Sequence, residues 1–235
     1  MNQPVPRHAV LIASGGLDSS VAAYHFAALG SKVSMLSFNY GQRHLRELVS
    51  AAEIAGLLDV AHDVVDLSSL GRLLGGSALT DRTMAVPHGH YRDDTMKVTV
   101  VPNRNAIMLE IAVGVAVAAG ADAVAFGAHA GDHTIYPDCR PTFFDAISDS
   151  IRAGNEGFLA DGFQLQAPFL HQSKADIVGR GAELGVPLEL TWSCYEGGER
   201  QCGACGTCVE RREAFNRAGV TDPTEYAVHG VESGR

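Results

Sequence analysis

Apolar positions along the chain follow two different periods, which together predict an α/β protein. Short apolar or alternating runs, typical of strands, occupy residues 9–13, 32–38, 61–66, 97–101, 123–127 and 163–167. Apolar positions with helical spacing lie between them, over residues 18–29, 46–57, 106–119, 143–153 and 174–184. Strands that alternate with helices form right-handed crossovers and a parallel sheet. We therefore expect a doubly wound, mainly parallel sheet with helices on both faces.

Glycines and one irregular segment mark the boundaries of these elements. Gly30 stands where a left-handed C-terminal cap belongs, and Gly120 and Gly185 follow the ends of two further helices. Residues 74–97 lose periodicity and are rich in Gly, Thr, Asp, His and Pro. A loop of this length inside a compact domain is typically a lid, a binding loop or a mobile segment.

The first predicted strand runs into a loop of small residues that opens the first helix. Residues 14–20 of this loop read Ser-Gly-Gly-Leu-Asp-Ser-Ser. The glycines let backbone N–H groups approach a ligand, the serines add hydroxyl donors, and a helix N-terminus favours phosphate. The loop is not of the Walker type, and it resembles the Ser-Gly-Gly-x-Asp-Ser signature of ATP pyrophosphatases. The alternative is a glycine turn capped by Asp18 or Ser19.

Four of the five cysteines cluster near the C-terminus, at Cys194, Cys202, Cys205 and Cys208. Four thiolates complete a tetrahedral Zn²⁺ site with no open position, so we expect a structural metal site. An iron–sulfur cluster is the main rival, although the fourth cysteine lies upstream and no Cys-Pro follows. Disulfides are a weaker alternative. Cys139 lies far from the cluster and is expected to be packed or to lie beside the substrate.

Polar loops over residues 39–44, 102–105 and 129–140 each follow a predicted strand. In a doubly wound sheet such loops converge on the crevice that holds the phosphate loop. Arg104 lies directly before a buried helix, and its planar fork suits phosphate oxygens. Lys174 begins another helix and would add a second cation. An exposed ion pair and a solvated lysine are the alternatives for these two residues.

Length and charge narrow the class of protein further. The chain of 235 residues suits one α/β domain with a small appendage, which we place at residues 1–186 and 187–235. A formal net charge of −9 argues against a broad grip on nucleic acid and favours a small-molecule substrate. No secretory signal and no run of about 18 apolar residues is recognised, so we expect a cytoplasmic protein without a membrane span.

Several motifs occur in a fixed order along the chain. They are residues 14–20, Asn-Tyr-Gly-Gln-Arg-His at 39–44, Tyr-Pro-Asp-Cys-Arg-Pro at 136–141, Lys-Ala-Asp-Ile at 174–177 and Thr-Trp-Ser-Cys-Tyr-Glu at 191–196. With the cysteine cluster, they make residues 9–212 resemble the 7-cyano-7-deazaguanine synthase (QueC) family of the ATP pyrophosphatase superfamily. The chain departs from that family at Asn103, where glycine is usual, and at His129 and His133, near the expected base-binding loop.

The resemblance implies that ATP drives the conversion of 7-carboxy-7-deazaguanine and ammonia into 7-cyano-7-deazaguanine, in queuosine-type biosynthesis. The reaction would pass through an adenylated acid and an adenylated amide, which makes the enzyme a ligase. The implied cofactors are ATP, a structural Zn²⁺ and Mg²⁺. A homodimer without direct nucleic-acid binding is also implied.

The resemblance also assigns the site residues. Those expected to act in catalysis are Arg104, Lys174 and Asp18, the last as a helix cap or a Mg²⁺ ligand. Those expected to bind nucleotide are Ala13, Ser14, Gly15, Gly16, Leu17, Asp18, Ser19, Ser20 and Val21. Those expected to bind the 7-deazapurine are Tyr40, Gln42, Asn105, Asp132, Tyr136, Asp138 and Arg140.

Two other functions are weighed against this one. Another enzyme of the superfamily could adenylate a tRNA base before thiolation or amidation, but the acidic charge and the narrow motifs count against it. The cysteine segment could instead belong to a zinc-ribbon nucleic-acid-binding protein, which only the flanking Arg211 and Arg212 support.

Overall fold

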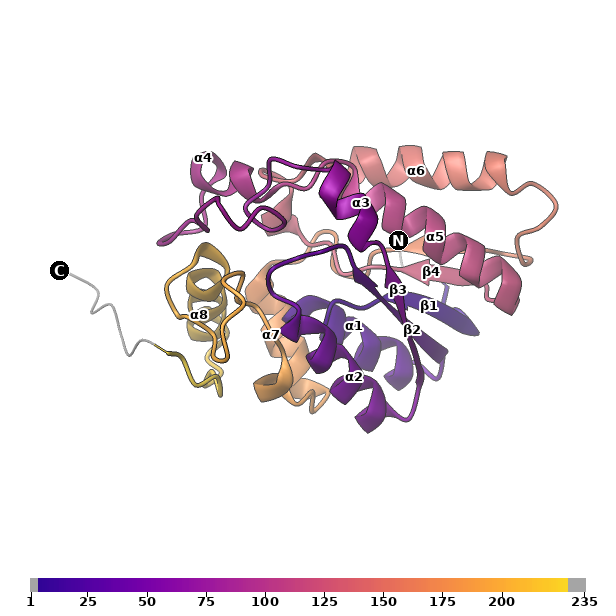
Figure 1. Ribbon diagram of the computed structural model, residues 1–235. Coiled ribbons are helices and arrows are strands. Elements are labelled where there is room, and N and C mark those ends of the chain that lie inside the picture. Colours follow the sequence, from indigo (N-terminus) through magenta and orange to yellow (C-terminus); the bar gives the residue numbers. More distant parts are fainter. Residues whose placement is uncertain (1–3, 228–235) are drawn as a thin grey trace.

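A five-stranded parallel sheet forms the centre of the computed structural model, which describes residues 4–227 apart from the side chains of residues 93 and 94 (Figure 1). The strands are β1 (His8–Ile12), β2 (Lys32–Asn39), β3 (Ala61–Asp66), β4 (Ala123–Ala125) and β5 (Gln164–Gln166). Their order is β3-β2-β1-β4-β5, and every neighbouring pair is parallel. The strand order therefore reverses between β1 and β4, which confirms the predicted doubly wound sheet.

Helices cover both faces of the sheet. They are α1 (Leu17–Ala28), α2 (Arg46–Leu58), α3 (Ser68–Leu73), α4 (Asp93–Met96), α5 (Arg104–Ala119), α6 (Pro141–Gly154), α7 (Lys174–Glu183) and α8 (Gly206–Ala218). Short 3-10 turns occupy η1 (Lys97–Thr99), η2 (Ala130–Asp132), η3 (Pro137–Cys139) and η4 (Leu188–Leu190). In Figure 1, α1, α2 and α7 lie below the sheet, α5 and α6 lie above it, and α8 lies at one end.

The alternation of side chains along β1 divides the core into two layers. Val10 packs with the residues of α5, and its neighbours Ala9 and Leu11 pack with those of α1 and α2 on the opposite face. All three are fully buried, as expected for the central strand of a parallel sheet. Ala214 and Phe215 of α8 join the second layer, so the cysteine segment is anchored in the main core.

One predicted strand, over residues 97–101, is wrong. Residues Lys97–Thr99 form η1, and the sheet of the described chain contains no strand from this segment. The β-branched side chains favour a strand, but the Thr99 hydroxyl donates to the Met96 carbonyl at 2.6 Å. This local bond offers the backbone an alternative to the ladder.

The helix after this turn is apolar enough to mimic a membrane span. The stretch Lys97–Ala119 meets the length and composition of one, with a mean hydropathy of 1.3. Core helices of folded domains meet the same test, and α5 packs Leu109, Ala112 and Val113 against the sheet.

The residue before α5, Asn103, has a φ of 59°. Asparagine tolerates this left-handed conformation, which explains how it stands where the resembled family uses glycine.

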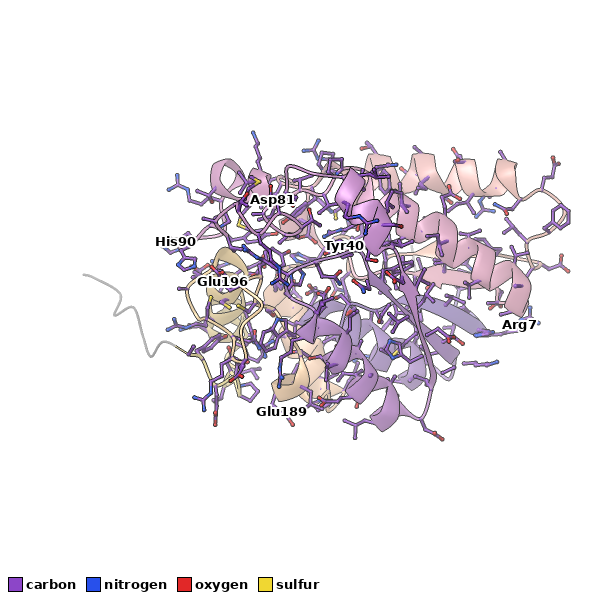
Figure 2. All side chains as sticks on the ribbon, in the orientation of Figure 1. Arg7, Tyr40, Asp81, His90, Glu189 and Glu196 are labelled. Atoms are coloured by element: carbon purple, nitrogen blue, oxygen red, sulfur yellow. The ribbon has the colours of Figure 1, made fainter. Side chains whose placement is uncertain are left out.

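The long segment over residues 74–97 lies against the C-terminal cysteine segment. The Gly89 N–H donates to the Ala204 carbonyl at 2.8 Å, and the Gly206 N–H donates to the Pro87 carbonyl at 3.1 Å. The Nδ1 atom of His90 lies 3.0 Å from the Oε1 atom of Glu213 in α8. Figure 2 shows His90 and Glu196 together at the α8 end of the molecule. The segment is therefore built into the fold through backbone contacts.

Gly71→Ala should lower the free energy of unfolding by about 1–3 kcal/mol. A Cβ at this position would lie 1.8 Å from the Tyr40 carbonyl oxygen, so α3 would have to move. Gly114→Ala is the control, since a Cβ there meets nothing within 4 Å on the exposed side of α5. It should gain about 0.5–1 kcal/mol from helix propensity. Urea unfolding measures both, and an unaltered Gly71→Ala protein would contradict the close packing of α3.

Candidate active site

A cavity opens at the carboxyl ends of β1 and β4, where the strand order reverses. Ligands of doubly wound proteins bind at this point. The cavity is lined by many residues that the sequence singles out, namely Ala13, Ser14, Gly16, Leu17, Asp18, Ser19, Tyr40, Arg104, Asn105, Asp132 and Lys174. The predicted convergence of separate loops on one crevice is therefore present in the structure.

The glycine–serine loop is held in place by its backbone. Gly15 has a φ of +79°, and a Cβ on it would lie 2.0 Å from the Glu47 carbonyl oxygen in α2. Its own carbonyl accepts the Trp192 N–H at 2.9 Å. No side chain of the described chain caps α1 at Gly16, so the alternative of a turn capped by Asp18 or Ser19 is not seen. An uncapped helix N-terminus of this kind is suited to binding an anion.

Lys174 forms the centre of a largely buried cluster of charges. Its Nζ lies 3.0 Å from Asp18 Oδ2, 3.1 Å from Glu210 Oε2 and 3.4 Å from His129 Nε2. Burial alone would lower the pKa of Lys174, but Asp18 and Glu210 outweigh it and raise that pKa above its ordinary value. Burial alone would raise the pKa of Asp18, and Lys174 and His129 bring it below its ordinary value. The lysine is therefore a fixed cation beside the loop.

Arg104 supplies a second cation from the N-terminus of α5. Its guanidinium lies over the Tyr40 ring, 5.6 Å from the centroid, and Nη1 donates to the Tyr40 hydroxyl at 3.3 Å. Burial raises the pKa of Tyr40 to about 12, so this hydroxyl stays protonated at neutral pH. Figure 2 shows Tyr40 near the middle of the molecule, where the loop after β2 passes over the sheet. Cation and ring hold each other in place at the cavity wall.

Glu47 and His44 line the cavity, although the sequence did not single them out as site residues. The Gln42 amide donates to Glu47 Oε1 at 2.8 Å, and His44 Nε2 lies 3.4 Å from Glu47 Oε2. Burial raises the pKa of Glu47 to about 7. Burial, with Arg104 as a smaller contributor, lowers the pKa of His44 to about 3, so this ring is neutral.

The remaining predicted residues do not line the cavity. Ser20 and Val21 are buried in α1, and Gln42 is buried beneath Glu47. The hydroxyl of buried Tyr136 lies 2.7 Å from Thr99 Oγ1. Two members of the loop after β4 make local contacts instead of lining the cavity: Asp138 accepts the Asn105 N–H at 3.2 Å, and Arg140 Nε donates to the His133 carbonyl at 2.6 Å.

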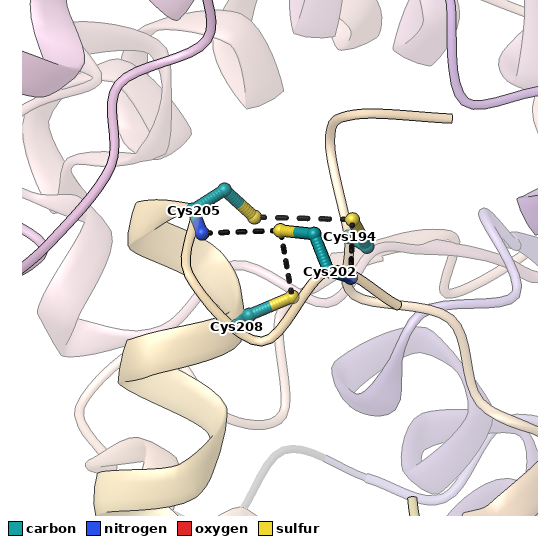
Figure 3. A group of neighbouring side chains, drawn as sticks. All are labelled: Cys194, Cys202, Cys205 and Cys208. Atoms are coloured by element: carbon teal, nitrogen blue, oxygen red, sulfur yellow. Dashed lines mark hydrogen bonds between the residues drawn. The ribbon is translucent and has the colours of Figure 1, made fainter. Parts of the chain in front are cut away.

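The four clustered cysteines come together as a candidate metal site (Figure 3). Their sulfur atoms all lie within 4.8 Å of one another, and the pairs Cys202–Cys208 and Cys194–Cys205 are each 4.0 Å apart. A tetrahedron with Zn–S bonds of about 2.3 Å has edges of about 3.8 Å. The Cys202 sulfur also accepts the Cys205 N–H at 3.2 Å. The cluster could therefore bind a metal such as zinc.

Arg211 joins the cysteine segment to the rest of the fold. Its side chain is fully buried and donates to Thr191 Oγ1 at 2.6 Å, to the Leu188 carbonyl at 2.9 Å and to Asp222 at 3.2 Å. A buried and fully engaged guanidinium cannot contact nucleic acid. This removes one of the two residues that support the zinc-ribbon alternative.

Fold and loop together define an α/β protein of the PP-loop class. The model of the family described as "Queuosine biosynthesis protein QueC" matches residues 8–219. The 7-cyano-7-deazaguanine synthase 1 of Mesorhizobium japonicum is 57% identical over 219 residues, 93% of each chain. The 7-cyano-7-deazaguanine synthase of Brucella anthropi is 56% identical over 217 residues, 92% of each chain. The chain belongs to the QueC family.

A solved structure shares the fold at low sequence identity. It is described as a predicted subunit of tRNA methyltransferase from Methanocaldococcus jannaschii. The TM-score is 0.50 at 15% identity, over 94% of this chain and 93% of that one. The likeness concerns the fold alone.

Several cavity residues come from the cysteine segment and were missed by the sequence reasoning. They are Trp192, Ser193, Tyr195 and Thr207, which line the cavity, and Glu210, which contacts Lys174. The Trp-Ser-Cys-Tyr motif was a usable signal for the first three, because a metal ligand alone does not need such neighbours. Glu210 lies in an Arg/Glu-rich helix, and its pattern there is the same as that of a solvated face.

Glu47→Gln should reduce the pH dependence of stability. With a folded pKa of about 7 against an ordinary 4.5, Glu47 keeps its proton in the folded state between these values while the unfolded chain releases it. Stability is therefore full below about pH 4.5 and is lost as pH rises to about 7, by roughly 3 kcal/mol. Between pH 5 and pH 8 the free energy of unfolding should fall by roughly 2–3 kcal/mol more in the wild type than in Glu47→Gln. An equal fall of the free energy of unfolding in the two proteins would contradict the raised pKa of Glu47.

Proposed function

We propose that this chain is a 7-cyano-7-deazaguanine synthase, which uses ATP to convert 7-carboxy-7-deazaguanine and ammonia into the nitrile. The arrangement that carries the proposal is the uncapped start of α1 facing two half-buried cations, Arg104 and Lys174, across one cavity. Its support from relatives is the 57% identity to the Mesorhizobium enzyme over nearly the whole chain. ATP dependence and the ligase class follow from the PP-loop and from the chemistry of the acceptor.

The acceptor explains the need for an adenylating site. A carboxylate oxygen leaves poorly, so the carboxylate first attacks the α-phosphorus of ATP and releases pyrophosphate. Ammonia then adds to the acyl-adenylate, and AMP leaves to give the amide. The amide oxygen attacks a second ATP, again with release of pyrophosphate. Loss of AMP and of the amide protons then leaves the nitrile.

In this proposal the chain acts by positioning and by charge stabilisation. Ser14, Gly15, Gly16 and Ser19 present donors to the phosphates at the start of α1. Arg104 and Lys174 stabilise the charge that develops on the phosphate oxygens. Asn105 and Asp132 line the same cavity and offer an amide and a carboxylate to the guanine-like edge of the substrate.

Two metal ions have fitting residues in the chain. The four cysteines suit Zn²⁺, which would hold the C-terminal segment in its folded form. Asp18 Oδ1 is buried and has no hydrogen-bond partner within the described residues. This oxygen suits Mg²⁺, which prefers carboxylate ligands and offsets phosphate charge. We propose residues 187–235 as the zinc segment packed on an α/β domain of residues 1–186.

Protein mixed with Mg-ATP, ammonium and 7-carboxy-7-deazaguanine should form the nitrile, with two AMP and two pyrophosphate for each nitrile. Mass spectrometry detects the nitrile and the amide, and chromatography counts the nucleotides. Arg104→Ala should lower kcat by about 100-fold or more, as expected for loss of a charge-stabilising donor. Substrate-dependent release of ADP in place of AMP would overturn the adenylation steps. Turnover only in the presence of tRNA would favour the other superfamily function.

Purified protein should contain one zinc ion per chain. Cys202→Ser should lose most of this metal and unfold at a lower temperature, because the ion stabilises the folded segment. Cys139→Ser is the matched control, since Cys139 lies near Asn105 and away from the cluster, and should keep its zinc. Elemental analysis and thermal melting measure both effects. Iron with acid-labile sulfide in place of zinc would identify the rival cluster.

A further inference from the structure

Helix α8, which follows the cysteine cluster, places the carboxylate of Glu210 beside Lys174 of the candidate active site. Glu210 lies two residues after Cys208, in the first turns of α8. Its Oε2 is 3.1 Å from Lys174 Nζ, and both side chains are largely buried, with 14% and 16% of their surfaces exposed. A Cβ on Gly131 would lie 3.5 Å from Glu210 Oε1, so the carboxylate also packs on the loop after β4. Glu210 therefore bridges three separate parts of the chain.

The ammonium of Lys174 can donate three hydrogen bonds. Asp18 Oδ2 takes one at 3.0 Å and Glu210 Oε2 takes another at 3.1 Å. His129 Nε2 is 3.4 Å away, but its ring already accepts the Gly131 N–H on Nδ1 at 3.0 Å. In the neutral ring the proton then lies on Nε2, which cannot accept from Lys174.

This geometry leaves one donor of Lys174 unused among the described residues, beside the glycine–serine loop. We infer that Glu210 is a positioning residue, whose carboxylate holds the Lys174 ammonium so that its third N–H points at the phosphate to be attacked. The inference rests on the proposed function for the identity of that phosphate. It gives the metal segment a part in the reaction, because Glu210 and the cluster residue Cys208 lie on the same helix. Asp18 alone would leave the long lysine side chain free to swing about one contact.

Lysine labelling tests the placement without any turnover. The sequence holds three lysines, Lys32, Lys97 and Lys174, so two of them are internal references. Acetic anhydride followed by peptide mass spectrometry should label Lys174 at least tenfold more slowly than the other two. In Glu210→Gln the labelling of Lys174 should rise at least fivefold, with no change at the references. Glu210→Asp, which keeps a carboxylate, should restore most of the protection.

Kinetics of the same variants test the consequence for the reaction. Glu210→Gln should lower kcat at least tenfold, while the KM for ATP changes less than threefold, because the lost contact acts on the placement of a charge in the transition state. In a Lys174→Ala background Glu210→Gln should cause no further loss, since the two residues act as one unit. Glu213→Gln is the matched control, one turn further along α8, where Glu213 pairs with exposed His90 and Arg217. It should label and turn over as the wild type does.

Zinc content and melting temperature separate positioning from a merely structural effect. Glu210→Gln should keep its zinc and melt within a few degrees of the wild type. Unchanged labelling of Lys174 in Glu210→Gln would overturn the inference. So would a loss of zinc with faster labelling of all three lysines, or equal damage by Glu210→Asp. A wild-type protein that forms no nitrile would overturn the proposed function and leave the labelling result to decide on Glu210.

Discussion

The site depends on the close approach of the Gly15 backbone to α2. A side chain at Gly15 would overlap the Glu47 carbonyl, so a hydrogen atom is all that this position admits. The contact fixes the loop from one side, and the Trp192 N–H fixes it from the other through the Gly15 carbonyl. Donors held in this way need no reorganisation when charge develops on a ligand. A loop that must be rigid is thus built from a flexible residue type, with rigidity supplied by its neighbours.

The cavity is electrostatically unlike the rest of the chain. A protein with a formal charge of −9 presents two half-buried cations to the cavity, and each is held by partners that oppose the cost of partial burial. Lys174 has carboxylates within hydrogen-bond distance, whereas Arg104 has an aromatic face and a hydroxyl. The lysine is therefore the more tightly neutralised of the two in the absence of phosphate. Arg104 contacts only a ring and a hydroxyl at this distance within the described residues, so less of its positive charge is offset.

Most of the fold could be predicted because it follows from short-range patterns. Apolar runs followed by helical spacing placed all five strands of the sheet. The wrong strand at residues 97–101 depended on a hydroxyl bond that propensity does not include. Loop motifs located the cavity as well, since parallel strands end at one edge. Glu47 and His44 could not be found in this way, because their shifted pKa values arise from burial. Glu210 could not be found because its partner Lys174 is distant in sequence.

The hydrogen bond from Trp192 to Gly15 has a consequence for the order of events during synthesis. The loop leaves the ribosome near the beginning of translation, but its partner follows some 180 residues later. At about 5–20 residues per second, that interval lasts on the order of ten seconds or more. Throughout this time the glycine–serine loop of the nascent chain lacks its hydrogen bond from Trp192. An incomplete chain therefore lacks this hydrogen bond, and the loop is fixed from both sides only once the last fifth of the molecule has been made.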